Sequence, residues 1–393
     1  MDIKKVVIVG GGIAGYSVAK GLCNQENKDI YFFTKERHMP YRRPSVNKDV
    51  FTKDKTIEQI SFPITQDMLN SVNFYIGEQV NSVDLDDRRI VTEKRIMDYD
   101  YLVLATGSFS RELNLPWISN NKEKVYYIRT FDDAIFLKNK ISSYKTGGKV
   151  TIIGAGILGL ELASSIVYTF GIKKVEILEK DKRVCSRVLS PLASDWLYKL
   201  HNFNGVDIKF GLTEYEINSH LETNYSDIVI VSIGTIPNIS LVEHSIKVDR
   251  GIIVDNQGKT SNNSVWAAGD CVSLLRDGIF WSPEDDTSAR RLGDLVAKSI
   301  INNKIEESFF DFPVRGWSNQ YGILINFIGL TSFSDDNHIE KIIVNKDNEL
   351  IIFIIEKSSK KIVGVITAGM GSLIRKSHNA IGLTQDQVDF STI

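Results

Sequence analysis

The sequence has 393 residues, 42% of them hydrophobic, which is enough apolar material for several packed cores and excludes a disordered chain. The formal net charge of −2 excludes a strongly basic nucleic-acid-binding protein, and the length corresponds to roughly two or three domains. The longest apolar runs, such as residues 350–355, are far shorter than the ~20 residues that span a bilayer, and no small-residue cleavage site follows the N-terminal apolar run, so we expect a cytoplasmic chain.

The N-terminal stretch predicts a dinucleotide-binding site. An apolar run suited to a buried parallel strand, residues 5–9, leads into Gly10-x-Gly12-x-x-Gly15 and a helix-like segment, residues 16–23. In such a motif the first glycine allows a tight turn, the second lets the backbone approach a pyrophosphate, and the third lets the helix pack closely on the strand. The pyrophosphate would then lie at the helix N-terminus.

A second apolar run completes this first motif. Residues 30–33 read as the next strand, and Glu36 lies twenty-one residues after Gly15, where a carboxylate can accept hydrogen bonds from a ribose diol. The strand, turn, helix, strand and acid at these spacings are far more specific than the glycines alone.

The same motif occurs a second time. A strand at residues 149–153 leads into Gly154-x-Gly156-x-x-Gly159, and the strand at 175–179 ends in Glu179, twenty residues after Gly159. Internal repetition of this kind sets the architecture of the whole chain. Two dinucleotide sites in one chain indicate electron transfer between two dinucleotides, with a tightly held flavin and a transient nicotinamide as the expected pair.

The cysteines exclude one branch of this chemistry. The chain has only Cys23, Cys185 and Cys271, so no pair has the CxxC or CxxxxC spacing that a disulfide-reducing flavoenzyme requires. We interpret all three as packing residues or bystanders rather than as a single catalytic thiol near the flavin.

Shorter signals fill in the rest of these two domains. Two prolines make residues 38–48 a loop that leads into a short helix, and residues 113–149 read as a linker and lead-in to the second glycine motif. Buried strands that run into a glycine turn are expected at 101–108 and 227–234, a short strand before Gly269-Asp270, and a helix at 288–300.

The C-terminal part has a different sequence pattern. From about Phe312, short β-rich runs separated by turn residues predict an antiparallel meander and a helical tail from about Ser372. The runs are residues 323–328, 341–344, 350–355 and 362–366.

Several stretches together resemble a known family, the FAD-dependent two-dinucleotide-domain reductases, in particular the ferredoxin, putidaredoxin and rubredoxin reductases. Beyond the glycine motifs, the resemblance rests on His38-Met39-Pro40-Tyr41-x-Arg43-Pro44 through Lys48, Ala105-Thr106-Gly107, residues 183–191, Gly234-x-x-Pro237-Asn238, Ala268-Gly269-Asp270 and Trp317-Ser318-x-Gln320-Tyr321. It covers essentially the whole chain.

The resemblance implies an α/β fold with two Rossmann-like dinucleotide-binding domains and a small C-terminal α+β domain. The expected domains are a discontinuous FAD-binding domain (1–113 and 243–311), an NAD(P)-binding domain (114–242) and a C-terminal domain (312–393).

The resemblance also implies residue roles. Lys48 would lie near flavin N5 and pair with Glu161 beside the nicotinamide, Asp270 would hold the ribityl chain, and Trp317 would lie beside the flavin. Pairing is physically sensible, because an isolated charge in such a site is costly. The expected FAD-binding residues are Gly10, Gly12, Ala14, Gly15, Glu36, Arg43, Lys48, Ala105, Thr106, Gly107, Asp270 and Trp317. The expected NAD(P)-binding residues are Gly154, Gly156, Ile157, Leu158, Gly159, Glu179 and Gly234, and no metal site is expected.

The chain departs from the family pattern at three places. Lys35 stands where relatives often carry a second acid, and Leu292 replaces a common glutamine. Residues 313–316 are not aromatic as they usually are in the family, which changes the surface expected for a redox partner.

The function expected from the resemblance is hydride transfer from NADH to FAD by means of Lys48 and Glu161. Single electrons then pass to a small iron–sulfur protein, a ferredoxin or rubredoxin. Glu179 favours NADH, while Lys180, Lys182 and Arg183 keep NADPH as an alternative. The rival functions are an NADH oxidase that uses oxygen directly and a non-catalytic redox sensor. We expect a monomer or homodimer without nucleic-acid or membrane partners.

Overall fold

The structure is a computed structural model that describes residues 3–144, 147–276, 279–302, 306–311, 313–333, 336–370 and 373–390. The chain forms two compact units. Unit 1 comprises Met1–Pro44, Lys55–Phe109 and Thr235–Phe312. Unit 2 comprises Ser45–Asp54, Ser110–Gly234 and Pro313–Ile393.

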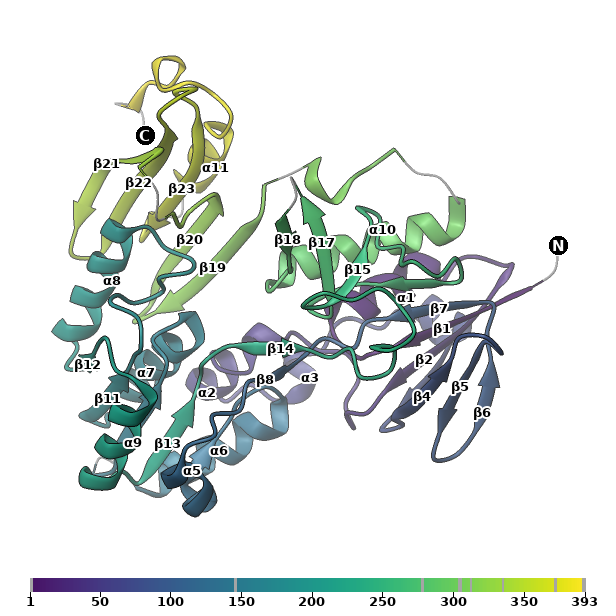
Figure 1. The fold of residues 1–393 in the computed structure, drawn as a ribbon, viewed down its shortest axis with the longest axis horizontal. Helices are drawn as coiled ribbons and strands as arrows, with labels where there is room; N and C mark the ends of the chain where they lie inside the picture. Colours follow the sequence, from purple (N-terminus) through teal and green to yellow (C-terminus); the bar gives the residue numbers. More distant parts are fainter. Residues whose placement is uncertain are drawn as a thin grey trace. The chain divides into compact units, whose positions relative to one another are not determined.

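Unit 1 is built on a five-stranded parallel sheet with the order β16-β7-β1-β2-β3 (Figure 1). The apolar runs explain its centre, because strands buried on both faces of a parallel sheet must be apolar throughout. The strands are β1 (Lys4–Val9), β2 (Lys28–Thr34), β3 (Val72–Ile76), β7 (Tyr101–Leu104) and β16 (Val265–Ala267). The predicted strands at 5–9, 30–33, 101–108 and before Gly269 therefore lie in one sheet.

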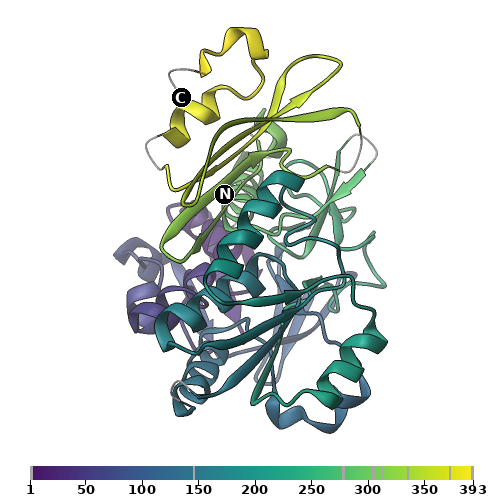
Figure 2. The same cartoon turned by 90° about the vertical axis from the view of Figure 1, so that its left-hand side faces the viewer.

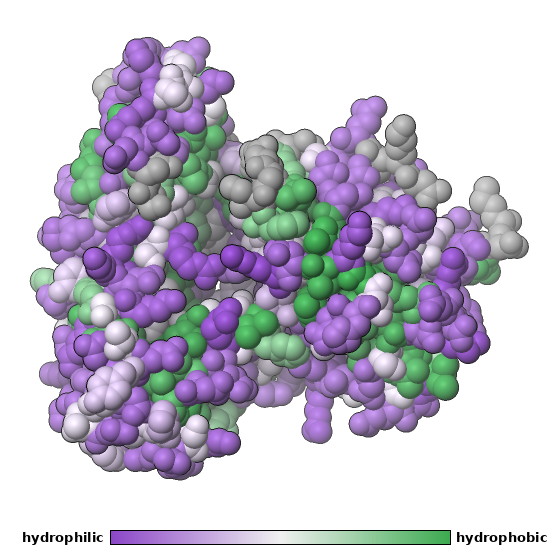
Figure 3. Space-filling model, viewed as in Figure 1, coloured by the Kyte–Doolittle hydropathy of each residue, from purple (hydrophilic) through white to green (hydrophobic). Residues whose placement is uncertain are grey.

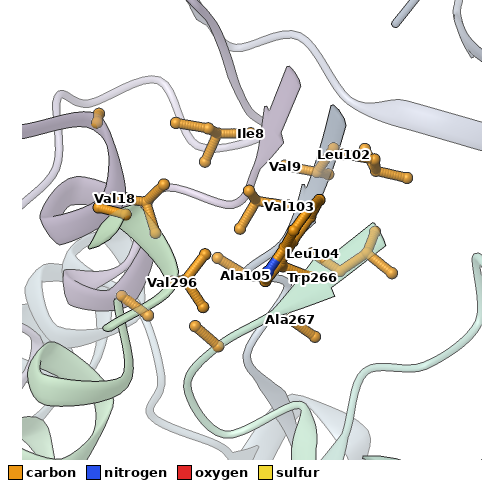
Figure 4. Close-up of a cluster of buried hydrophobic side chains, with 14 of the residues drawn as sticks. Ile8, Val9, Val18, Leu102, Val103, Leu104, Ala105, Trp266, Ala267 and Val296 are labelled. Carbon is orange, nitrogen blue, oxygen red and sulfur yellow. The ribbon is translucent and has the colours of Figure 1, made fainter. Parts of the chain in front are cut away.

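Two helices, α1 (Ile13–Leu22) and α10 (Asp286–Asn302), pack together in unit 1. A Cβ added to Gly293 of α10 would lie only 2.5 Å from the carbonyl oxygen of Ala14, so the two backbones touch. Figure 4 shows Val18 of α1 and Val296 of α10 in the same apolar cluster as Val103 and Trp266 of the sheet. The first helix begins three residues earlier than predicted, directly at the glycine turn.

Smaller elements complete unit 1. An antiparallel sheet of β4 (Val80–Asp84), β5 (Arg89–Thr92) and β6 (Ile96–Asp98) contributes Val80 and Ile90 to the same core. A mixed sheet contains β15 (Ile252–Val254), β17 (Val272–Arg276) and β18 (Ile279–Trp281), and β8 (Ser108–Ser110) pairs with β14 (Thr235–Pro237). The short helices are α3 (Ile57–Ile60), α4 (Gln66–Ser71), and the 3-10 turns η1 (Arg43–Ser45) and η3 (Phe309–Asp311).

Unit 2 repeats the parallel design with the strand order β12-β11-β10-β13-β9. The strands are β9 (Val125–Tyr126), β10 (Lys149–Ile153), β11 (Lys174–Leu178), β12 (Asp207–Lys209) and β13 (Ile228–Val231). The helices are α2 (Asp49–Lys53), α5 (Pro116–Asn120), η2 (Lys122–Lys124), α6 (Phe131–Ser143), α7 (Ile157–Phe170), α8 (Pro191–Phe203) and α9 (Glu214–Thr223).

The prediction of a linker at residues 113–149 is wrong. The segment contains α5, the sheet strand β9 and the 13-residue helix α6. The helix begins at a capping box in which Thr130 and Asp133 bond each other's backbone N–H groups, a start signal that the sequence carried.

The C-terminal sheet in unit 2 is antiparallel, with the order β19-β20-β23-β22-β21. Its strands are β19 (Arg315–Gln320), β20 (Ile323–Gly329), β21 (His338–Lys346), β22 (Glu349–Glu356) and β23 (Ile362–Ala368). The predicted meander holds only for β21 to β23, because β20 pairs with β23 instead of β21, and β19 was not predicted.

The helical tail contains α11 (Ile374–Asn379) and η5 (Gln385–Gln387). Figures 1 and 2 show the yellow tail beside this sheet, where Ala380 shares a core with Phe353 and Val365. Phe312 and Ser372, at which the C-terminal domain and its tail were predicted to begin, lie outside the described residues.

Among the described residues, no helix is both long enough and apolar enough to cross a bilayer. Hydrophilic side chains cover much of the face shown in Figure 3, and hydrophobic residues form separate patches there.

Candidate functional site: two glycine turns and a buried ion pair

The first glycine turn closes tightly between β1 and α1. Gly10 has a φ of +127°, and a Cβ there would lie 2.0 Å from the carbonyl oxygen of Ala105. A Cβ on Gly15 would lie 2.2 Å from the carbonyl oxygen of Gly10. At Gly12, the N-cap of α1, an added Cβ would meet nothing within 4 Å. The residues that must be glycine for packing are therefore crowded, while the space before the helix N-terminus is open.

The second turn, between β10 and α7, repeats these contacts. A Cβ on Gly154, whose φ is +104°, would lie 2.4 Å from the carbonyl oxygen of Ser232. One on Gly159 would lie 2.1 Å from the carbonyl oxygen of Gly154, whereas Gly156 again faces open space. Both turns thus have the room and the unpaired helical N–H groups that a pyrophosphate needs.

Several predicted residues sit at the carboxyl ends of adjacent parallel strands in unit 1. The N–H of Ala105 donates to Val9 at 2.8 Å, and the hydroxyl of Thr106 donates to the carbonyl of Asn238 at 2.6 Å. Asp270, which follows β16, accepts a hydrogen bond from Ser108 at 3.0 Å. This edge is where ligands bind in open α/β sheets. Ala14, by contrast, is buried beneath α10.

Glu36 is held by two other residues of unit 1. Arg43 contacts its Oε1 at 2.6 Å and the Tyr41 hydroxyl donates to its Oε2 at 2.5 Å. Burial alone would raise the pKa of Glu36, but Arg43 and Tyr41 outweigh it and hold the pKa below its usual value. The carboxylate is therefore ionised and oriented, and each oxygen retains a lone pair for a ribose hydroxyl.

Glu179 is held by backbone groups instead. The N–H of Ala155, inside the second glycine turn, donates to its Oε2 at 2.5 Å, and the N–H of Asp181 donates to its Oε1 at 2.7 Å. The carboxylate therefore helps to shape the turn as well as facing it. Gly234 has a φ of +102°, and its carbonyl accepts from the N–H of Arg111 at 2.9 Å. Ile157 and Leu158 are half-buried in the first turn of α7.

Unit 2 brings together three of the predicted residues, Lys48, Glu161 and Trp317. The Lys48 ammonium lies 2.9 Å from Glu161 Oε2 and 4.6 Å from the centre of the Trp317 ring. The side chain of Glu161 is 3% exposed and that of Lys48 16%, so this is a nearly desolvated pair. Trp317 keeps 39% of its surface exposed, which leaves its ring accessible.

Three elements position this pair. Glu161 lies on α7, one turn beyond the second glycine turn, and Lys48 is the N-cap of α2. The short helix α2 is fixed from α6, because Lys138 donates to the carbonyl of Val50 at 2.7 Å and pairs with Asp54. The hydroxyl of Ser165 on α7 also donates to the carbonyl of Asn47 at 3.3 Å.

Asn47 and Ser318 complete the site and were not predicted. The Asn47 amide donates to Glu161 Oε2 at 2.6 Å, and the Ser318 hydroxyl donates to Oε1 at 2.6 Å. Each residue is adjacent in sequence to a predicted one, and Ser318 lies in the Trp-Ser-x-Gln-Tyr stretch, but no sequence pattern indicates which side chain meets Glu161.

The structure buries the side chains of the cysteines. All three are free and buried. Burial raises the pKa of Cys185 and of Cys271, so these thiols stay protonated and unreactive.

Comparisons with known proteins fit this geometry. The family model described as pyridine nucleotide-disulphide oxidoreductase matches residues 4–293. A rubredoxin-NAD(+) reductase of Pseudomonas putida is 30% identical over 368 residues, which cover 88% of this chain and 90% of that protein. A ferredoxin–NAD(P)(+) reductase of a Sphingomonas species is 31% identical over 353 residues, which cover 85% and 83% of the two chains.

A solved structure has the same fold. The reductase in a covalent putidaredoxin reductase–putidaredoxin complex is similar with a TM-score of 0.83 and 25% identity, covering 96% of this chain and 93% of that one. The fold class and the family resemblance predicted from the sequence are thereby confirmed. With its paired glycine turns and a family match over most of its length, the chain belongs to the pyridine nucleotide-disulphide oxidoreductase family.

Proposed function

We propose that this protein is an FAD-dependent reductase that takes hydride from NADH and delivers single electrons to a small iron–sulfur protein of the ferredoxin or rubredoxin type. The observation that carries the proposal is the nearly desolvated Lys48–Glu161 pair. The pair lies beside an accessible tryptophan, and its Glu161 is on the helix that begins at the second glycine turn. The names of the relatives, rubredoxin-NAD(+) reductase and ferredoxin–NAD(P)(+) reductase, support the same activity.

Unit 1 offers the features that FAD requires. The proposed pyrophosphate site is the open space before α1 at Gly12. Glu36 and its partner Arg43 are the proposed contacts of the ribose and phosphates. Asp270 and the strand-end residues 105–107 are the proposed contacts of the ribityl chain and ring. Bound FAD supplies an acceptor for hydride and a donor of single electrons.

Unit 2 offers the features that NADH requires. The proposed pyrophosphate site is the open space at Gly156, and Glu179 would receive the adenosine ribose. Arg183 is poorly placed to receive the additional phosphate of NADPH, because its guanidinium donates to the carbonyl of Ser186 at 2.8 Å and to the hydroxyl of Ser194 at 2.7 Å. The proposed donor is therefore NADH, with Lys180 and Lys182 as the remaining basic residues nearby.

The role proposed for Lys48 and Glu161 is electrostatic and geometric. A lysine held by a buried carboxylate presents a fixed positive charge, and a fixed charge stabilises developing negative charge without reorganisation. Trp317 would support the stacked rings. The other proposed contacts are those predicted from the sequence. At Ala14 the proposed contact is a backbone one, because its side chain is buried and lies close to Gly269.

The proposed domains follow the sequence. They are an FAD-binding domain of residues 1–113 and 243–311, an NAD(P)-binding domain of 114–242 and a C-terminal domain of 312–393. Residues 45–54, within the first of these ranges, form part of unit 2. We also propose a cytoplasmic location, the location expected for a chain with such short apolar runs.

A reductase assay tests the proposal directly. The purified chain is loaded with FAD, reduced anaerobically with NADH, and then offered ferredoxin, rubredoxin, quinone or oxygen. We expect rapid bleaching of the flavin by NADH, slower bleaching by NADPH, and cytochrome c reduction that depends on an added iron–sulfur protein. Fast turnover with oxygen alone would identify an NADH oxidase. A long-lived reduced state with NADH-dependent dimerisation would identify a redox sensor.

A further inference from the structure

A line of buried polar side chains extends from Glu161 into the interior of unit 2. On β19, which lies against α7, alternate side chains point inward, and the inward residues Ser318 and Gln320 are polar. His201 of α8 lies beside them, and all three are 0% exposed. Polar side chains are seldom buried this completely unless they are hydrogen-bonded, so their partners are informative.

Four hydrogen bonds join these residues into one chain. Glu161 Oε1 and the Ser318 hydroxyl are 2.6 Å apart, and the Ser318 oxygen lies 2.9 Å from Gln320 Nε2. Gln320 Oε1 lies 2.6 Å from His201 Nε2, and His201 Nδ1 lies 3.0 Å from the Tyr321 hydroxyl. The line thus runs from the carboxylate to a half-buried phenol.

The direction of every bond in this line is fixed by chemistry. An ionised carboxylate only accepts, so Ser318 must donate to Glu161 and accept from the Gln320 amide. The Gln320 carbonyl must then accept from His201 Nε2–H. Burial lowers the pKa of His201 to about 4, so the imidazole is neutral, carries its proton on Nε2, and accepts from Tyr321 at Nδ1. All four donors point toward Glu161.

The outer end of the line is anchored in an unusual backbone conformation. Tyr321 and Gly322 form the two-residue turn between β19 and β20, with φ values of +52° and +80°. Glycine or asparagine normally occupies such a position, and a bulky aromatic residue there is an outlier. The N–H of Tyr321 donates to the hydroxyl of Ser164 on α7 at 2.7 Å. A positive φ at Tyr321, whose N–H and hydroxyl are both hydrogen-bonded, points to a functional requirement for this side chain.

We propose that Ser318, Gln320, His201 and Tyr321 are positioning residues for Glu161. Their aligned donors hold Oε1 of the carboxylate, so that Oε2 stays directed at Lys48 and Asn47. A carboxylate held from both oxygens cannot rotate, and the lysine therefore keeps its place beside Trp317. This inference deepens the proposed function, because it assumes that the Lys48–Glu161 pair serves hydride transfer.

The test compares variants of the FAD-loaded chain by rapid mixing with NADH. Ser318→Ala and Gln320→Met each remove a link with little change in volume, Ser318→Thr restores the hydroxyl, and Asn319→Ala changes the exposed neighbour as a matched control. We expect the limiting rate of flavin reduction to fall about tenfold in Ser318→Ala and Gln320→Met, the effect of losing one charge-linked hydrogen bond, with little change in the apparent affinity for NADH. Ser318→Thr should recover most of the rate, and Asn319→Ala should match the parent chain.

A second measurement does not depend on turnover. Long-range ¹H–¹⁵N spectra of the histidine rings should show His201 neutral with its proton on Nε2, and Tyr321→Phe should shift the Nδ1 resonance and lower the reduction rate less than Gln320→Met does. A parent chain that fails to take up FAD or to be reduced by NADH overturns the proposed function itself. An active parent with a fully active Gln320→Met variant, or a His201 protonated on Nδ1, overturns only the positioning role.

Discussion

Replacement of Lys48 by methionine tests the physical basis of the site most directly. The substitution keeps an unbranched side chain one atom shorter and removes the ammonium that lies 2.9 Å from Glu161 Oε2. Removing one member of a buried ion pair typically costs about 3–5 kcal/mol. Because Lys48 is 16% exposed and the carboxylate keeps Asn47 and Ser318, we expect a smaller cost of about 2 kcal/mol in local stability.

A double-mutant cycle isolates the pair. Glu161→Gln leaves the Lys48 ammonium without its counter-charge and should also cost about 2 kcal/mol, because Lys48 is only 16% exposed. The double variant should cost less than the sum of the single ones by about 1–2 kcal/mol, since it leaves no buried charge unpaired. Hydrogen exchange of the α7 amides, read by mass spectrometry, measures this without assuming two-state unfolding of a chain with two compact units.

The same variants report on the reaction. Lys48→Met should retain FAD, because the proposed flavin contacts other than Lys48 and Trp317 lie in unit 1, and should be reduced by NADH at least about tenfold more slowly. The reasoning would be refuted if Lys48→Met left both the exchange of α7 and the reduction rate unchanged. Additive single effects in the cycle would likewise show that the 2.9 Å contact carries no coupling.

Three further predictions concern other features of unit 2. Lys149, Thr151 and His220 outweigh the effect of burial and lower the pKa of Glu176 from 4.5 to about 2. The free energy of unfolding should therefore be undiminished above about pH 4.5 and fall by up to about 3 kcal/mol as the pH drops to about 2. In acid titrations, Glu176→Gln should largely remove this dependence on pH. Gly156→Ala should fold normally but bind NADH more weakly by calorimetry, since its Cβ would occupy only the open phosphate space, whereas Gly154→Ala should lower the melting temperature because its Cβ would meet a carbonyl at 2.4 Å. Glu179→Ala should raise the KM for NADH without creating a preference for NADPH, and efficient use of NADPH by this variant would contradict the placement of Arg183.

The elements that the sequence predicts well are those with strong apolar periodicity. Strands such as 149–153 and 228–231 are buried on both faces, so the apolar runs alone locate them. The missed strand β19 has the opposite pattern, because its inward side chains include Ser318 and Gln320 and its outward ones include Trp317. A strand that buries polar residues reads as a loop. The two-residue strand β9 is too short to give any periodic signal.

The candidate site likewise contains residues that could be predicted from the sequence and residues that could not. Lys48, Glu161 and Trp317 could be predicted because they stand in motifs of a resembling family, and the structure places them together. Their partners could not, since Asn47 and Ser318 reach Glu161 from positions 114 and 157 residues away in sequence. Hydrogen bonds over such separations follow from the packing of α2, α7 and β19, which no local pattern encodes.

The composition of unit 2 from three separate stretches of chain has a consequence for dissecting the protein. A fragment of residues 110–234 would contain the whole second glycine turn and helix α7, and would look like an autonomous nucleotide-binding module. Its Glu161, however, takes its partners Asn47, Lys48 and Ser318 from the two stretches left out, 45–54 and 313–393. Transferring residues 110–234 alone into another protein would therefore carry over the glycine turn but lose the Lys48–Glu161 ion pair.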